Sequence, residues 1–357
     1  MEENQQSPKP APAAPPSRRK GMSGFMIASI IVGILIIFSL IYFIPFVAMG
    51  AEKEAVIKIP AGATVKTVED SVAKYLGADY SEKVAKAAKL TKADFSRRHG
   101  AYPIEEGMSP AKACHRLMKG AQHPLMLTIN GFRSADLLAQ RVARRLDFTA
   151  DSLLNAMSDP ATLSEYGLQP GQALALFLDD SYEVYWSASP ADIIKKVGDN
   201  YKRVWNEERT AKAEKLGLTP VQVMTICSIV DEETNKADEK GKVGRLYINR
   251  LNVGMPLQAD PTIRFALGDF TIKRVKGEHL NVDSPFNTYR NRGLPPAPIR
   301  TTSVATIDSV LDSEPSEYLY MCAKEDFSGY HNFAESYAEH LDNARRYQKE
   351  LDRLGIE

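Results

Sequence analysis

The longest apolar run of the chain lies near its N-terminus, where residues 25–47 include no charged side chain. A helix rises about 1.5 Å per residue, so this run is about long enough to cross a hydrocarbon core of about 30 Å. We therefore expect a transmembrane helix over residues 25–47. The alternative is a cleavable signal peptide that ends in the small residues after this run. The apolar region of a signal peptide is usually only about 7–15 residues long, which is shorter than this run.

After this run, shorter patterns alternate between strand and helix. Residues 56–60 and 101–104 are typical of short strands, and each is followed by a helix-start signal, Thr64 in the first case and Ser109-Pro110 in the second. Two strand–helix units so close together predict a small α+β module over residues 51–125.

The rest of the chain, residues 126–357, carries the same mixture of patterns on a larger scale. The expected strands are residues 123–129 and 181–186, and the expected helices begin at Ser134, Thr149, Ser189-Pro190, Thr219-Pro220 and Ser336. The charged helix from Ser189 is expected to run to about Leu216, and the last helix to about Leu354. The predicted fold class is therefore α+β, with one N-terminal transmembrane helix, a small α+β module and a larger α+β domain.

Charge changes this picture only at the N-terminus. The chain has 45 basic and 45 acidic side chains, so its composition does not indicate nucleic acid as a partner. Its first residues are rich in Pro, Gln, Ala and Ser, and we expect residues 1–24 to form a disordered tail that carries the basic cluster Arg18-Arg19-Lys20. Because basic flanks stay cytoplasmic, the tail is expected inside and everything after residue 50 outside the membrane.

The most informative segment is a strong helix-start signal at residues 219–222, followed by an almost wholly apolar run that ends in three acids, Asp231-Glu232-Glu233. Successive residues of a helix differ by about 100°, so the three carboxylates point in different directions. Glu232 falls opposite the apolar face and is expected to be solvated. Asp231 and Glu233 flank the two edges of that face.

Asp231 and Glu233 are therefore the candidate catalytic groups, and helical geometry does not choose between them. An apolar wall disfavours the charged form of a carboxyl and raises its pKa, so that a proton is available near neutral pH for a leaving oxygen. The alternative is that the acidic triplet is simply a solvated helix end.

Further motifs follow in order along the chain: Tyr247-Ile248-Asn249-Arg250-Leu251, Met255-Pro256-Leu257-Gln258-Ala259-Asp260-Pro261-Thr262, Asn287-Thr288-Tyr289, Gly293-Leu294-Pro295-Pro296, and the side chains His331, Phe333, Glu339 and His340. Together with residues 228–234, they resemble the endolytic murein transglycosylase family (MltG/YceG-like). The resemblance is strong over residues 220–345 and mainly architectural over residues 51–215. It implies a LysM-like module at 51–125 and a transglycosylase catalytic domain at 126–357.

The resemblance also implies the reaction and the catalytic residue. The family segment reads Glu-x-Glu-Thr, and its second glutamate, the catalytic acid/base, is Glu233 here, while Asp231 stands where the first glutamate is usual. The implied reaction cleaves the β-1,4 bond between N-acetylmuramic acid and N-acetylglucosamine. The muramic C6 hydroxyl attacks its own anomeric carbon and leaves a 1,6-anhydro end, which would trim or terminate nascent glycan strands.

The surroundings of Glu233 are predicted from the same motifs. Residues expected to bind the substrate or to support Glu233 are Asp231, Arg250, Gln258, Asp260, Thr262, Asn287 and Tyr289. We expect no metal and no organic cofactor, peptidoglycan glycan strands as the substrate, and cooperation with peptidoglycan synthases. The expected location is the bacterial cytoplasmic (inner) membrane, crossed once, with the N-terminus inside and the catalytic domain in the periplasm.

Three other functions compete with this one. A noncatalytic peptidoglycan-binding scaffold would use the small module beside an inert second domain. A water-using muramidase would use Asp231 and Glu233 as paired carboxylates, which stand about 5–9.5 Å apart in ordinary glycosidases. A zinc peptidase built on His331 and His340 is disfavoured, because these residues lie more than one helical turn apart and no H-E-x-x-H motif occurs.

Overall fold

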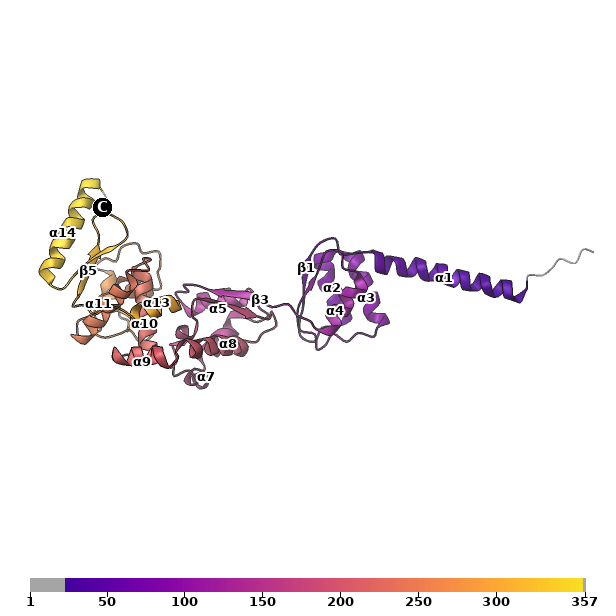
Figure 1. The fold of residues 1–357 in the computed structure, drawn as a ribbon, viewed down its shortest axis with the longest axis horizontal. Helices are drawn as coiled ribbons and strands as arrows, with labels where there is room; N and C mark the ends of the chain where they lie inside the picture. Colours follow the sequence, from indigo (N-terminus) through magenta and orange to yellow (C-terminus); the bar gives the residue numbers. More distant parts are fainter. Residues whose placement is uncertain (1–22, 356–357) are drawn as a thin grey trace, which may run out of the picture. The chain divides into compact units, whose positions relative to one another are not determined.

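The computed structural model describes residues 23–355, so the expected N-terminal tail lies outside the described residues up to position 22. The chain divides into two compact units (Figure 1). One unit contains the N-terminal helix with residues 64–95 and 103–119, and the other contains residues 58–63, 96–102 and everything from Gly120 onward.

The N-terminal helix α1 spans Gly24–Ala48 and begins at Ser23, whose side chain accepts a hydrogen bond from the backbone N–H of Met26. Its residues 24–41 are long and apolar enough as a helix to cross a membrane, and none of them is buried in the protein. The helix expected over residues 25–47 is therefore present. Apolar side chains exposed along a whole helix are typical of contact with lipid.

The part of the chain before residue 120 continues with short strands and helices around a small core, and its two strands are divided between the two units. The elements are β1 (Ala55–Ile59), α2 (Val65–Leu76), α3 (Ala78–Leu90), β2 (Gly100–Ile104) and α4 (Pro110–Lys119), and β1 pairs with β2. Thr64 and Thr67 form the reciprocal capping box of α2, as its helix-start signal predicts. The sequence predicts a second helix after Ser81, and α3 begins three residues before that serine, at Ala78.

The second unit opens with a two-stranded antiparallel sheet and a group of helices. Strand β3 (Leu125–Ile129) pairs with β4 (Asp180–Val184), and the connecting chain forms α5 (Ala135–Ala143), α6 (Ala150–Ser158), α7 (Pro160–Ser164) and the 3₁₀ turn η1 (Ala173–Leu176). The caps expected at Ser134 and Thr149 are both formed by their side chains. The sheet thus places the loop that follows β3, residues 130–134, beside the loop that precedes β4.

The long charged helix expected from Ser189 to Leu216 is wrong. Two helices take its place, α8 (Pro190–Val204) and α9 (Glu207–Lys215). Asn206 starts the second helix, because its side chain accepts the backbone N–H of Arg209 and so favours a new N-terminus over a continued helix. The charged pattern runs across this break and therefore conceals it.

Helix α10 (Pro220–Glu233) is the centre of the second unit. Its capping box joins Thr219 and Gln222, and residues 223–231 are all buried, including Cys227. A helix that is buried all round needs neighbours on every side. Around it lie α9, α11 (Lys240–Asn252), α12 (Asp260–Leu267) and α13 (Val304–Leu311), as Figure 1 shows for α9, α11 and α13.

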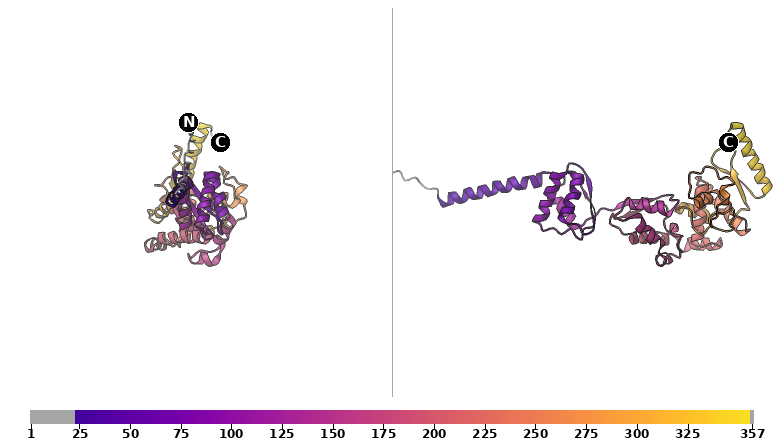
Figure 2. Two further views of the ribbon diagram at one scale, coloured as in Figure 1. Left: turned by 90° about the vertical axis from the view of Figure 1, so that its right-hand side faces the viewer. Right: turned by 180° about the vertical axis from the view of Figure 1, so that it is seen from behind.

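The last elements form a small layer at the C-terminal end of the second unit. They are the antiparallel strands β5 (Tyr320–Ala323) and β6 (His331–Ala334) and α14 (Tyr337–Leu354), while the 3₁₀ turn η2 (His279–Asn281) lies earlier in the chain and packs on α12. Helix α14 packs against both strands (Figure 2) and begins at Ser336, as expected. Strand β6 carries His331, which contacts Glu239 in the segment between α10 and α11.

Candidate active site

Glu233 is the last residue of α10, and its carboxyl is only partly exposed. The hydroxyl of Tyr247, a buried residue of α11, donates a hydrogen bond of 2.8 Å to Oε1 of Glu233. Burial raises the pKa of Glu233 above its ordinary value, and the hydrogen bond from Tyr247 opposes that rise. The result is a carboxyl that is held in one orientation and is able to keep a proton at a higher pH than a free glutamate.

Asp260 and Tyr289 form a second hydrogen-bonded pair in the same site. The hydroxyl of Tyr289 donates to Oδ1 of Asp260 at 2.6 Å. The negative charge of Asp260 contributes to the raised pKa of Glu233, while the positive charges of His331 and Arg264 lower it. The pKa of Tyr289 is itself raised by burial and by Asp260, so its hydroxyl stays protonated as a donor.

The sequence of residues 258–262 predicts a short polar loop stiffened by proline, and this prediction is wrong over its second half. Helix α12 begins at Asp260, with Pro261 in its first turn, where proline is a helix-start signal. Gln258 precedes the helix with φ +48°, and its side chain is exposed. The helix start fixes Asp260 relative to Glu233 more firmly than a loop would.

Thr262 and Asn287 are fully buried and hold the backbone around Asp260 and Tyr289. The hydroxyl of Thr262 contacts that of Thr288 at 2.8 Å, and Thr288 accepts the backbone N–H of Ala259. Asn287 donates to the carbonyls of Leu280 and Val282 and accepts the backbone N–H of Tyr289. These contacts place Thr262 and Asn287 behind the site, where they shape the loops.

Arg250 also acts on the backbone. Its guanidinium donates to the carbonyls of Leu257 and Leu319 at 2.6 Å each, and it lies 5.8 Å from the ring centroid of Tyr320. It therefore ties the segment before α12 to the start of β5. His340, which lies in α14, stacks on the ring of Tyr320.

His331 is brought to the site by β6 and is held by a buried acid. Its backbone N–H donates to Oε1 of Glu239 at 2.7 Å, and its Nδ1 lies 2.9 Å from Oε2 of the same residue. A carboxylate at Nδ1 fixes the ring orientation and favours a proton on that nitrogen. Nε2 is then left for other contacts.

Glu232 is not solvated, which corrects the expectation from the helical pattern. Its side chain is only 6% exposed, and Oε1 accepts hydrogen bonds of 2.8 Å from both Arg133 and Arg300. The two arginines come from the loop after β3 and from the segment before α13. Helix α10 is therefore enclosed on the side that its hydrophobic pattern assigned to solvent. The two arginines compensate the buried negative charge of Glu232.

Asp231 points into a separate polar cluster. Its carboxylate accepts from Nζ of Lys240 at 2.6 Å, from the hydroxyl of Thr306 at 2.8 Å, and from the hydroxyl of Thr302. Its side chain is 5% exposed. The carboxylate is thus fully occupied by structural contacts.

The acidic triplet therefore divides into three roles that local sequence does not reveal. The partners of Glu232 and Asp231 lie up to about a hundred residues away along the chain, as for Arg133, and no local signal marks them. Within residues 23–355 no group of three His, Cys, Asp or Glu side chains is arranged to hold a metal ion. The chemistry offered by the described residues is that of one oriented carboxyl with a raised pKa, flanked by tyrosines, an aspartate and a histidine.

A family model described as the YceG-like family matches residues 57–346. The chain belongs to the YceG-like family. The family match begins in β1 and ends in α14, so it includes the whole site described above.

Relatives of known name extend this result. A protein of Bacillus subtilis (strain 168) named endolytic murein transglycosylase is 25% identical over 310 residues, which cover 82% of this chain and 84% of the relative. Proteins of the same name from Streptococcus pneumoniae strains D39 and R6 are 27% identical over 253 residues, which cover 63% of this chain and 46% of theirs. This chain therefore matches less than half the length of the streptococcal relatives.

A solved structure of the same family has a similar fold. The crystal structure of a YceG-like protein from Listeria monocytogenes matches with a TM-score of 0.55 and 24% identity, and the match covers 81% of this chain and 98% of the other. At this identity the likeness concerns the fold alone, and the α+β class expected from the sequence agrees with it.

Proposed function

We propose that this chain is a membrane-anchored endolytic lytic transglycosylase that cuts peptidoglycan glycan strands, with Glu233 as its catalytic acid/base. The observation that carries the proposal is the Glu233 carboxyl itself, oriented by Tyr247 and given a raised pKa by burial. A carboxyl of this kind can donate a proton to a leaving oxygen near neutral pH. The names of the Bacillus and Streptococcus relatives support the substrate class.

The proposed reaction needs one carboxyl group for two proton transfers. Glu233 first protonates the glycosidic oxygen between N-acetylmuramic acid and N-acetylglucosamine, and the bond from that oxygen to the muramic anomeric carbon breaks. The muramic C6 oxygen then bonds to the anomeric carbon, and its proton passes to the Glu233 carboxylate. The products are a 1,6-anhydro end and a free N-acetylglucosamine hydroxyl, and the enzyme returns to its starting state without consuming water.

The position of Asp231 favours this reaction over a water-using muramidase that pairs Asp231 with Glu233. Ordinary glycosidases use two carboxyl groups across the scissile bond. Asp231 is neutralised by Lys240 and held by two threonine hydroxyls, so it is not free to act on a sugar. The remaining acid beside Glu233 is Asp260, which already accepts the hydroxyl of Tyr289.

The proposal also covers the membrane location of the enzyme, its small N-terminal module and its partners. The exposed apolar helix α1 supports a single membrane anchor, and the basic cluster at residues 18–20 supports a cytoplasmic N-terminus with a periplasmic catalytic domain. The paired strands β1 and β2 and their helices support a small LysM-like module. Trimming of nascent strands beside peptidoglycan synthases is supported by the sequence resemblance alone.

The decisive test is mass spectrometry of purified peptidoglycan after digestion by the full-length protein in detergent, beside its Glu233→Gln variant. We expect internal cuts with 1,6-anhydro ends from the native protein and no cuts from the folded variant. Reducing ends would make the enzyme a muramidase, for which Asp260 would be the second carboxylate. Strand binding without cleavage by either protein would make it a scaffold.

A further inference from the structure

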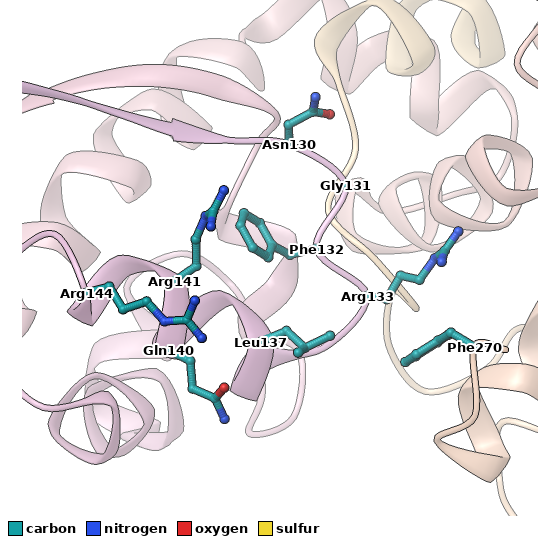
Figure 3. Close-up of a pocket in the computed structure, with 9 residues that line it drawn as sticks. All are labelled: Asn130, Gly131, Phe132, Arg133, Leu137, Gln140, Arg141, Arg144 and Phe270. Carbon is teal, nitrogen blue, oxygen red and sulfur yellow. The ribbon is translucent and has the colours of Figure 1, made fainter.

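A cleft of about 490 Å³ lies beside the C-terminal end of α10, and all of its charged side chains are basic. Figure 3 shows Arg133 and Phe270 on one side and side chains of α5 on the other. The lining residues that matter here are Phe132, Arg133, Gln140, Arg141, Arg144 and Phe270. No aspartate or glutamate lines the cleft, so it favours an anionic ligand.

Two of the three arginines are free to bind such a ligand. Arg141 lies on the last turn of α5 and Arg144 follows it, and both side chains are exposed. Within the described part of the chain, neither guanidinium makes an ion pair or a side-chain hydrogen bond. Arg133 is partly occupied, because its Nε donates to Oε1 of Glu232.

The cleft is coupled to the candidate active site through Glu232. This residue precedes Glu233, and consecutive Cα atoms lie about 3.8 Å apart. It binds both Arg133 in the cleft wall and Arg300. Gly131, also in the wall, has φ +65°, and a Cβ atom there would stand 2.4 Å from Nη2 of Arg300. The glycine thus lets Arg300 reach Glu232, and the cleft wall is joined through Glu232 to the helix that ends in Glu233.

We propose that this cleft binds the free carboxylates of the peptide that branches from the muramic acid residue at the cut bond. The proposal rests on the proposed function and specifies the part of the substrate that is recognised. In peptidoglycan the lactyl carboxyl of muramic acid is in amide linkage to this peptide, so the glycan backbone is uncharged and the anions lie on the branch.

The chemistry of the cleft matches a peptide branch better than a sugar ring. Guanidinium groups bind carboxylates through paired charge-assisted hydrogen bonds, and Arg141 and Arg144 offer two such groups close together in sequence. Phe132 and Phe270 add apolar surface for the small aliphatic side chains of such a peptide.

The test measures strand binding by the full-length Glu233→Gln protein in detergent micelles, so that it does not depend on cleavage. Two ligands are compared: soluble peptide-bearing strands, and the same strands after carbodiimide and ammonia convert their free carboxylates to amides. The variant is Arg141→Gln with Arg144→Gln. The matched control is Arg345→Gln with Arg353→Gln, which removes two exposed, ion-paired arginines from α14.

We expect binding about 3- to 10-fold tighter for the carboxylate strands than for the amidated strands. The Arg141/Arg144 variant should lose this preference, and the α14 control should keep it. Equal binding of both ligands by the parent protein, or a preference that survives the Arg141/Arg144 change, would overturn the proposal.

Two further outcomes separate the possible failures. If both strand ligands bind equally well and inorganic pyrophosphate displaces them, the cleft binds phosphate groups, and the peptide proposal fails. Absence of binding to any strand would refute the proposed peptidoglycan substrate and the cleft assignment together. Binding without charge preference would refute the cleft assignment alone.

Discussion

The hydroxyl of Tyr247 donates a 2.8 Å hydrogen bond to Oε1 of Glu233, so a buried residue of α11 orients the carboxyl at the end of α10. This bond stabilises the charged carboxylate and holds the pKa of Glu233 below the value that burial alone would give. The same contact therefore sets both the geometry and the protonation of the candidate acid/base.

Replacing Tyr247 by Phe should raise the pKa of Glu233 and reduce the rate. Because the first step of the proposed reaction uses the protonated carboxyl, the basic limb of the pH profile of kcat/KM should move to higher pH. Loss of one hydrogen bond is worth about 1 kcal/mol, which also predicts a several-fold fall in kcat/KM at the optimum. The measurement is the pH profile of full-length protein. Tyr201→Phe removes a different buried hydroxyl and should leave the profile unchanged.

Replacing Asp260 by Asn should move the same limb in the opposite direction. The negative charge of Asp260 raises the pKa of Glu233, so its removal should lower that pKa and shift the basic limb to lower pH. Asparagine keeps an oxygen that can accept the hydroxyl of Tyr289, so the loop should stay in place. The same charge change at the exposed Asp283 serves as the control, and an unmoved limb in the Asp260 variant would contradict the assignment.

The local signals in the sequence predicted the helix starts well. Thr64, Thr219 and Ser336 each cap the helix expected at that position, because a cap depends on side chains within three residues of it. The order of most elements follows from such signals together with helical periodicity.

Contacts between distant segments account for what the sequence did not predict. Periodicity assigned Glu232 to solvent, yet Arg133 and Arg300 enclose it from far along the chain in both directions. The cluster of Asp231 with Thr302 and Thr306 has the same origin. A pattern along one helix shows which face is apolar, but it does not show which other elements cover the polar face.

Asp231 should prove essential to stability and dispensable for the proton transfers. Its replacement by Ala leaves the amine of Lys240 without its counter-ion, and breaking a buried pair costs about 3 kcal/mol or more. The partial exposure of Lys240 places the expected loss at the low end, measurable by urea unfolding of the full chain. Asp231→Asn should be milder.

The pH profile of the folded Asp231→Asn protein distinguishes the two enzymatic mechanisms. If Asp231 is structural, both limbs of the pH profile of kcat/KM should stay at their native positions, and only the maximal kcat/KM should fall. Loss of one limb would mean that Asp231 takes part in proton transfer, as in the muramidase that pairs it with Glu233.

Glu233 should destabilise the fold at high pH, because burial raises its pKa in the folded protein. Its pKa is raised in the folded protein, so the folded state binds more protons than the unfolded state between the unfolded value near 4.5 and the folded value. Stability must therefore fall as the pH rises through this window. Glu233→Gln removes the group, so the variant should gain stability relative to the native protein as the pH is raised from 4 to 8. Scanning fluorimetry at several pH values measures this difference. In the Tyr247→Phe background the folded pKa is higher still, so the same comparison should give a larger pH-dependent gain, and a gain that does not depend on pH would refute the raised pKa.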